Sequence, residues 1–292
     1  MLADRAIRTG DGRALAYAEW GDPDAFPVFQ LHGTPGSRLG HHPDESVYVD
    51  AGVRLITYNR PGYGGSDRLQ GRRVVDCVSD IEAIADALEL ERFAVTGGSG
   101  GGPHSLAVAA SLPERVTRAA CASSPAPYDV GVDWFTGMDP LNVEEIKTAL
   151  EGEEVYIPYL EREAAAALER VAEDPSKLLG DDWELSEADR AMLAREEFGA
   201  VIRADVTEAL SAGVFGWADD MWAVLEPWGF EIADIRVPTR VIYGVTDVLV
   251  PKQHGEWLAE HVPGAEIVVE EDLGHLGDPD LLSERLGWLV QT

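Results

Sequence analysis

The stretch RFAVTGGSGGGPHSLAVAASL at residues 92–112 decides the fold class of this 292-residue chain. Its first part is β-rich, its last part has a helical pattern, and Ser99 stands between them in GGSGG (97–101). This is a G-x-S-x-G pattern in the strand–turn–helix context that lifts a serine hydroxyl above a sheet. Glycines flank such a turn because a Cβ would collide with neighbouring backbone. The stretch predicts a nucleophilic Ser99, with the Gly100 N–H as an oxyanion donor at a helix N-terminus.

The same glycines also permit a simple Gly-rich turn that binds phosphate. A dinucleotide-binding fingerprint fits poorly, because the serine lies within the loop itself. In addition, no strand that ends in an acidic residue follows about 20 positions later. The pattern therefore favours the nucleophile.

Short β-rich runs alternate with amphipathic stretches on both sides of Ser99. Residues 6–21 (AIRTGDGRALAYAEWG) predict a hairpin whose turn is Asp11-Gly12. Further strands are predicted at 27–33, 53–62, 92–99, 115–124, 237–244 and 265–271, and helices at 74–90, 102–112, 252–262 and 281–290. This alternation predicts an α/β fold, a mostly parallel central sheet with helices on both faces.

The middle of the chain differs in composition and in predicted secondary structure. Residues 129–234 contain 27 acidic and 7 basic residues, five of the eight tryptophans and no convincing strand. Helical patterns such as LEREAAAALERVAEDPSKLL (160–179) dominate there. We therefore expect an inserted helical cap at 129–234, between a first core part at 1–128 and a second at 235–292. The aromatic residues are expected mainly in the cap's own core, and its acids mainly on a solvated face.

Composition excludes several classes of partner. With 23 Lys and Arg against 53 Asp and Glu, the formal charge of −30 disfavours nucleic acids and anionic membrane surfaces. No apolar run approaches a membrane span, and the N-terminus has no signal-peptide pattern, so a cytoplasmic protein is expected. Cys77 and Cys121 have no metal-ligand partners at zinc spacing and predict free thiols. A homo-oligomer is compatible with the sequence, which does not decide the oligomeric state.

Four motifs in order resemble the α/β-hydrolase superfamily over nearly the whole chain. They are FQLHGTPGS (29–37), YNRPGYGGSD (58–67), the GGSGG turn, and a late acid and histidine. The resemblance implies the α/β-hydrolase fold and a second oxyanion amide from Thr34, which follows His32-Gly33. His32, and Arg60 and Asp67 in the second motif, are expected to be structural.

A serine hydroxyl needs a general base, and the base needs an orienting acid. The superfamily's chain order of serine, acid and histidine favours His275, in the loop EDLGHLGD after the last predicted strand. The acid is expected at Asp247 in YGVTDVLVP, which matches the family's G-x-x-D pattern, with Asp272 as a weaker competitor. No metal or organic cofactor is implied.

These residues predict a serine hydrolase of a small, largely apolar carboxylic ester or lactone, acting through an acyl-enzyme. Proline iminopeptidases are similar in HG-x-PG and in the Gly-Gly-Ser of the turn, but they usually have Gly where Thr34 stands and Trp where Gly100 stands. An iminopeptidase-like aminopeptidase, a carbon–carbon bond hydrolase and a non-enzymatic ligand-binding protein of this fold all remain alternatives.

Overall fold

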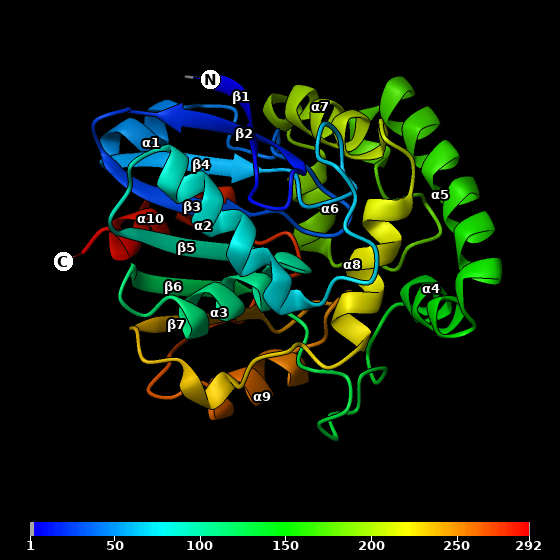
Figure 1. The fold of residues 1–292 in the computed structure, drawn as a ribbon. Coiled ribbons are helices and arrows are strands. Elements are labelled where there is room, and N and C mark those ends of the chain that lie inside the picture. The colour runs from blue at the N-terminus through cyan, green and yellow to red at the C-terminus, as the bar shows by residue number, and fades with distance from the viewer. Residues whose placement is uncertain (1–2, 292) are drawn as a thin grey trace.

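The computed structural model describes residues 3–291 and is organised around one eight-stranded sheet (Figure 1). The strand order is β1-β2-β4-β3-β5-β6-β7-β8. The strands are β1 (Ala3–Arg8), β2 (Ala14–Gly21), β3 (Phe26–Leu31), β4 (Val53–Tyr58), β5 (Phe93–Gly98), β6 (Val116–Ala122), β7 (Thr239–Gly244) and β8 (Glu266–Glu270).

The first two strands form the predicted hairpin. Strands β1 and β2 pair antiparallel with Arg8 opposite Ala14, and Gly12 has a φ of 92°, which the tight turn requires. Strand β2 also pairs antiparallel with β4, while every later pairing is parallel. The prediction of a mostly parallel sheet is confirmed.

Helices cover both faces of the sheet, as predicted. One face packs against α2 (Cys77–Ala87), α3 (Gly101–Ser111) and α9 (Gln253–His261), around buried residues such as Ile81, Leu106 and Leu258. The other face packs against α1 (Ser46–Asp50) and α10 (Leu282–Leu289), around Tyr48 and Leu286.

Between β6 and β7 the described chain is helical. We call residues 129–234 the helical segment; its helices are α4 (Pro140–Leu150), α5 (Glu153–Glu173), α6 (Glu187–Leu193), α7 (Gly199–Leu210) and α8 (Phe215–Leu225). Figure 1 shows α4, α5, α7 and α8 gathered at one end of the sheet. The helix predicted to continue to residue 179 ends at Glu173, because Asp174 caps a new short helix that begins at Pro175.

The carboxyl ends of the parallel strands meet at one edge of the sheet, which is where α/β proteins place their sites. Ser99 follows β5, Asp247 and His275 follow β7 and β8, and His32-Gly33-Thr34 follows β3. Among the described residues, no helix is both long and apolar enough to cross a membrane.

Candidate active site

Ser99 lies on a strained turn between β5 and α3. Its φ is 53°, a left-handed conformation that is uncommon outside glycine, and its N–H donates to the Ala122 carbonyl at 2.9 Å. A Cβ on Gly97 would lie 2.1 Å from the Gly101 carbonyl oxygen, and one on Gly101 would lie 2.1 Å from the Leu31 carbonyl oxygen. Both positions of the G-x-S-x-G pattern therefore accept only glycine without movement of the backbone.

His275 and Asp247 are brought together, although 28 residues separate them. Asp247 Oδ2 lies 2.9 Å from His275 Nδ1, and Oδ1 of the same carboxylate accepts the Leu249 and Val250 N–H groups at 2.8 Å each. The carboxylate is therefore fixed by backbone donors and aimed at the imidazole. The competing Asp272 is exposed, and the ring nitrogen is bonded to Asp247 instead.

The surroundings of His275 favour its protonated form. Burial alone would lower the pKa of the imidazole, but the charge and hydrogen bond of Asp247, together with the charge of Asp189, outweigh it. The pKa of His275 is therefore raised above its ordinary value. This suits a base that must hold a proton while a carbonyl adduct forms.

Ser99 and His275 line the same cavity. Within residues 3–291 the Ser99 hydroxyl makes no hydrogen bond to another residue, so it is free to turn toward a ligand. Catalytic hydrogen bonds are often long in unliganded enzymes and shorten in the substrate complex.

Thr34 and Gly100 present backbone donors beside Ser99. In the part of the chain that the structure describes, neither N–H donates a hydrogen bond to another residue, and both residues line a cavity with Ser99. They also pack tightly together: a Cβ on Gly100 would lie 2.3 Å from Thr34 Oγ1 and 2.9 Å from its Cβ. The threonine thus occupies the space that a side chain at position 100 would need.

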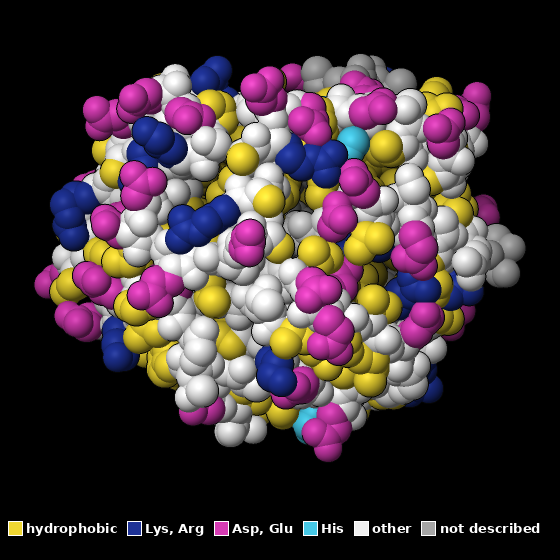
Figure 2. Space-filling view, turned by 180° about the vertical axis from the view of Figure 1, so that it is seen from behind, with side chains coloured by type: hydrophobic (Ala, Val, Ile, Leu, Met, Phe, Trp, Pro, Cys, Tyr) yellow, Lys and Arg dark blue, Asp and Glu magenta, His cyan; other side chains and the backbone are white. Residues whose placement is uncertain are grey.

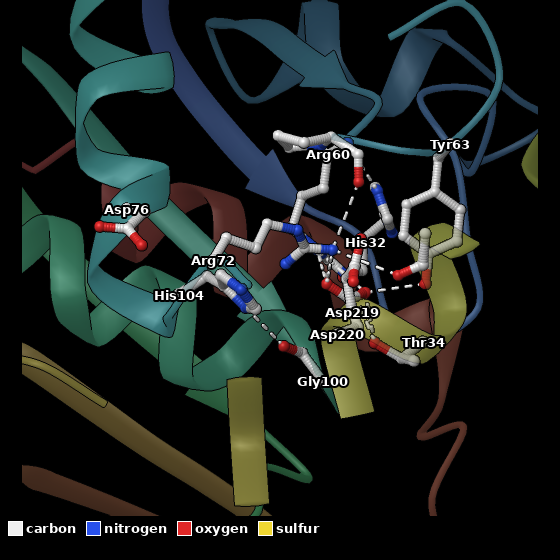
Figure 3. Close-up of polar contacts among 12 residues, drawn as sticks. His32, Thr34, Arg60, Tyr63, Arg72, Asp76, Gly100, His104, Asp219 and Asp220 are labelled. Carbon is white, nitrogen blue, oxygen red and sulfur yellow. Dashed lines mark hydrogen bonds and ion pairs between the residues drawn. The ribbon is translucent and has the colours of Figure 1, made fainter. Parts of the chain in front are cut away.

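A buried charge network lies beside His32-Gly33-Thr34, which we call the oxyanion loop after the role that the sequence predicts for the Thr34 N–H (Figure 3). The Arg60 guanidinium donates to the carbonyl oxygens of His32 and Gly33, and it is paired with Asp220 of α8. Both side chains of this pair are fully buried. Asp220 also accepts from Thr34 Oγ1 at 2.8 Å. The helical segment is therefore connected directly to the oxyanion loop.

Two further side chains bond to the Asp220 carboxylate. Its carboxylate lies 2.6 Å from Arg72 and 2.8 Å from the Tyr63 hydroxyl. Burial alone would raise the pKa of Asp220, but the two guanidinium groups hold it well below its usual range. The carboxylate is consequently ionised, and its hydrogen-bonding capacity is already taken.

His32 braces the same loop, which agrees with the expected structural role. Its Nδ1 donates to the Gly33 carbonyl at 2.7 Å, and its Nε2 accepts the Arg60 N–H at 3.2 Å. Burial, reinforced by the Arg60 charge, lowers the pKa of His32 well below its ordinary value, so the ring is neutral. Arg60 is structural in the same sense, and Asp67 accepts the Ala14 N–H at the edge of the hairpin.

Asp189 of α6 is a site residue that sequence reasoning missed. Its side chain is fully buried and accepts the backbone N–H groups of His275 at 3.1 Å and Leu276 at 2.7 Å. The helical segment therefore also holds the loop that carries the histidine. The spacing of Ser186 and Asp189, a helix N-terminal pattern in which Ser186 caps Asp189, was the available signal.

Five acids of the helical segment are buried, against the expectation of a mainly solvated acidic face: Asp139, Glu145, Asp189, Asp219 and Asp220. Most of the other acids are exposed, but Asp205 and Glu208 are half-buried and bonded to Ser37 and Arg38. Figure 2 shows acidic side chains spread over the face seen there rather than gathered in one patch. Among residues 3–291, no cluster of His, Cys, Asp or Glu could hold a metal ion. Both cysteines are buried and free.

Comparison with known proteins decides the family. Residues 27–277 match the family model described as alpha/beta hydrolase fold. The chain belongs to this family. A proline iminopeptidase of Arabidopsis thaliana is 27% identical over 96% of this chain and 77% of its own length. A pimeloyl-[acyl-carrier protein] methyl ester esterase of Aromatoleum aromaticum is 30% identical over 78% of this chain and 82% of its own.

Other proteins similar to this chain carry other names. A non-heme chloroperoxidase of Streptomyces lividans is 33% identical over 49% of this α/β hydrolase and 53% of its own length, so the match spans about half of each chain. Among solved structures, a hydrolase from Pseudomonas aeruginosa superposes with a TM-score of 0.71 at 21% identity, covering 99% of this chain and 98% of its own. An enol-lactonase from Burkholderia xenovorans gives 0.67 at 20%, covering 98% of both. The family and the names of the iminopeptidase and esterase relatives support a hydrolase, and the family suggests a small-molecule substrate. The solved structures show the shared fold.

Proposed function

We propose that this α/β hydrolase is a serine hydrolase that cleaves a small, largely apolar carboxylic ester or lactone. Ser99 attacks the carbonyl carbon while His275 takes its proton, and Asp247 orients the imidazole and stabilises its charged form. The N–H groups of Thr34 and Gly100 bind the oxyanion. His275 then protonates the leaving oxygen, and water hydrolyses the acyl-enzyme by the same steps in reverse.

The observation that carries the proposal is the convergence at Ser99. Ser99, on a left-handed turn, shares one cavity with His275, whose ring lies 2.9 Å from Asp247. It shares a second cavity with Thr34 and Gly100, whose backbone N–H groups have no partner among the described residues. The cavity that Ser99 shares with Thr34 and Gly100 is lined mainly by apolar side chains, including Trp134, which suits an apolar substrate.

The iminopeptidase alternative has support from the names of relatives but not from the site. The two sequence departures at positions 34 and 100 are sterically one change, because a Trp at 100 would occupy the place of the Thr34 side chain. A free amino terminus would also need an available carboxylate. Asp220, which lines the cavity shared by Ser99 and Gly100, is already bonded to Arg60, Arg72, Tyr63 and Thr34. Asp205, which lines the cavity shared by Ser99 and His275, accepts the N–H and the hydroxyl of Ser37.

A substrate panel tests the proposal. Aryl esters, lactones and aminoacyl arylamides are compared with the same enzyme, together with an aminoacyl ester and its N-acetyl form. We expect esters or lactones to be cleaved and the N-acetyl ester to be accepted. A preference above ~100-fold for the free amine, about 2.7 kcal/mol, would replace the proposal with the aminopeptidase. Turnover of none of these classes would favour the carbon–carbon hydrolase or the binding protein.

A further inference from the structure

Two cavities of different size meet at Ser99. The smaller has a volume of about 90 Å³, and Thr34 and Gly100 lie in its wall. The larger has a volume of about 440 Å³, and His275 lies in its wall. Ser99 lines both cavities, while the oxyanion donors line only the small one and His275 only the large one.

This arrangement of the two cavities indicates where the acyl half and the alcohol half of an ester would each bind. In the acylation step the bond between Ser99 Oγ and the carbonyl carbon forms, and the bond from that carbon to the alcohol oxygen breaks. The proton that leaves Ser99 passes through His275 to the departing oxygen, so that oxygen must face His275. The alcohol half therefore extends into the large cavity. The acyl chain, attached to the same carbon, is left with the small cavity beside the oxyanion donors.

We propose that the small cavity is an acyl pocket, and that the substrates are open-chain esters of a short, apolar carboxylic acid with a larger alcohol. The inference rests on the proposed function and adds the substrate class to it. A cavity of about 150 Å³ holds benzene, so 90 Å³ accommodates an acyl chain of about four carbons. A small lactone, whose two halves are one short ring, fills the two cavities less completely.

The lining of the small cavity sets the polarity of the acid. Its apolar wall includes Trp134, Met138 and Ile146 from the helical segment and Leu249 from the loop after β7. Polar side chains at its edge are already bonded. Both ring nitrogens of His254 are engaged, at 3.2 Å each, by the Ala126 N–H and the Trp134 carbonyl. An acyl chain there meets hydrocarbon rather than free charges.

The large cavity has a different wall. Its apolar lining includes Met192, Phe198 and Ile202 of the helical segment and Leu276 and Leu282. Charged side chains also line it: Asp205, Arg240, Glu270 and Arg285. Its volume is about five times that of the small cavity, so bulk is accepted on the alcohol half and not on the acyl half.

A pair of matched variants tests the assignment. Ile146→Ala enlarges the small cavity and Ile202→Ala the large one. Leu249→Ala also enlarges the small cavity. Because Leu249 is only half-buried, this substitution should remove less core packing than Ile146→Ala does. For each protein, kcat/KM is measured on 4-nitrophenyl esters with acyl chains of increasing length, and on acetates of increasingly large alcohols.

We expect the unmodified enzyme to lose about tenfold in kcat/KM once the acyl chain exceeds about four carbons, because each excess methylene must displace packed side chains. Ile146→Ala and Leu249→Ala should move this limit to longer acids and leave the alcohol series within about twofold. Ile202→Ala should change the alcohol series alone.

The opposite pairing, with Ile146→Ala acting on the alcohol series, would overturn the assignment. So would an acyl series without a length limit. Failure of the proposed function is distinct: no ester would be cleaved, and a fluorophosphonate would not label Ser99.

Discussion

The oxyanion loop and the loop with His275-Leu276, which we call the histidine loop, are each held by one buried carboxylate of the helical segment, but through different interactions. Asp220 accepts directly from Thr34 of the oxyanion loop, and its ion-pair partner Arg60 donates to carbonyl oxygens of the same loop. Asp220 is also paired with Arg72. Asp189 reaches the histidine loop through two neutral backbone N–H groups. Both carboxylates are 0% exposed, so neither is screened by water.

The difference lies in what each carboxylate leaves behind when it is removed. Neutralising Asp220 strands two buried guanidinium groups, and an uncompensated buried charge is strongly destabilising. Neutralising Asp189 strands only neutral donors, which is a smaller penalty. It also removes a negative charge near His275. The oxyanion loop should therefore respond mainly in stability, and the histidine loop mainly in the proton affinity of the base.

We expect a substitution at Asp247 to have the largest effect on catalysis. Asp247→Asn should lower kcat about 10³–10⁴-fold, because an amide favours the wrong tautomer of His275. The exposed Asp272→Asn is the matched change and should have little effect. Steady-state kinetics of the two purified variants provide the measurement, and reversed results would assign the acid to Asp272.

Asp220→Asn is expected to have the largest effect on stability. We expect the free energy of unfolding to fall by about 3–5 kcal/mol. Its neighbour Asp219→Asn is the control: Asp219 pairs with Arg68, whose side chain is 26% exposed and can be hydrated after the change. Urea unfolding monitored by tryptophan fluorescence compares the two. Equal losses would mean that the Arg60 network has no special energetic role.

Asp189→Asn should lower the stability less than Asp220→Asn does. We expect a loss of about 1–3 kcal/mol in stability, because one of the two backbone N–H groups then faces an amide donor. We also expect the acid limb of the kcat/KM profile to move to lower pH, because Asp189 raises the pKa of His275. Glu187→Gln, exposed on the same helix, should do neither. An unchanged acid limb would confine Asp189 to a purely structural role.

The pH dependence of kcat/KM in the unmodified enzyme is the reference for the shift expected in Asp189→Asn. Only neutral His275 can accept the serine proton, and its pKa is raised, so kcat/KM should fall as pH decreases through a value above about 6.5. Asp220→Asn should not move this limb, since Asp220 is not among the groups that act on His275. A pH–rate profile that falls only below pH 6 would contradict the raised pKa.

The smallest effect is expected from salt. On the face of the molecule seen in Figure 2, acidic side chains are interspersed with other side chains and form no single patch. We expect kcat/KM for neutral aryl esters and for cationic esters of similar size to change alike between low and moderate ionic strength. A steep loss confined to the cationic esters would show that the acids steer substrate.

The fold was predictable because its strands, helices and turns are indicated by periodic apolar runs and turn residues that lie close together in the sequence. The hairpin at Asp11-Gly12 and the turn at Ser99 depend on neighbours in sequence, and the structure has both. Asp189 and Asp220 act through contacts 86 and 160 residues away along the chain, to His275 and Arg60. Within a segment of 27 acids, nothing local separates such a residue from a solvated one. The one hint at Asp220 is its place in the apolar helix FGWADDMWAVL.

Covalent labelling of Ser99 tests the central claim most directly. The protein is incubated with a fluorophosphonate, and the intact mass and the modified peptide are determined by mass spectrometry, with Ser99→Ala in parallel. We predict one adduct per chain, on Ser99, no adduct in the variant, and a loss of esterase kcat on the order of 10⁴–10⁶ in the variant. An adduct on another residue, or a Ser99→Ala protein that keeps more than a few per cent of its activity, would contradict the account.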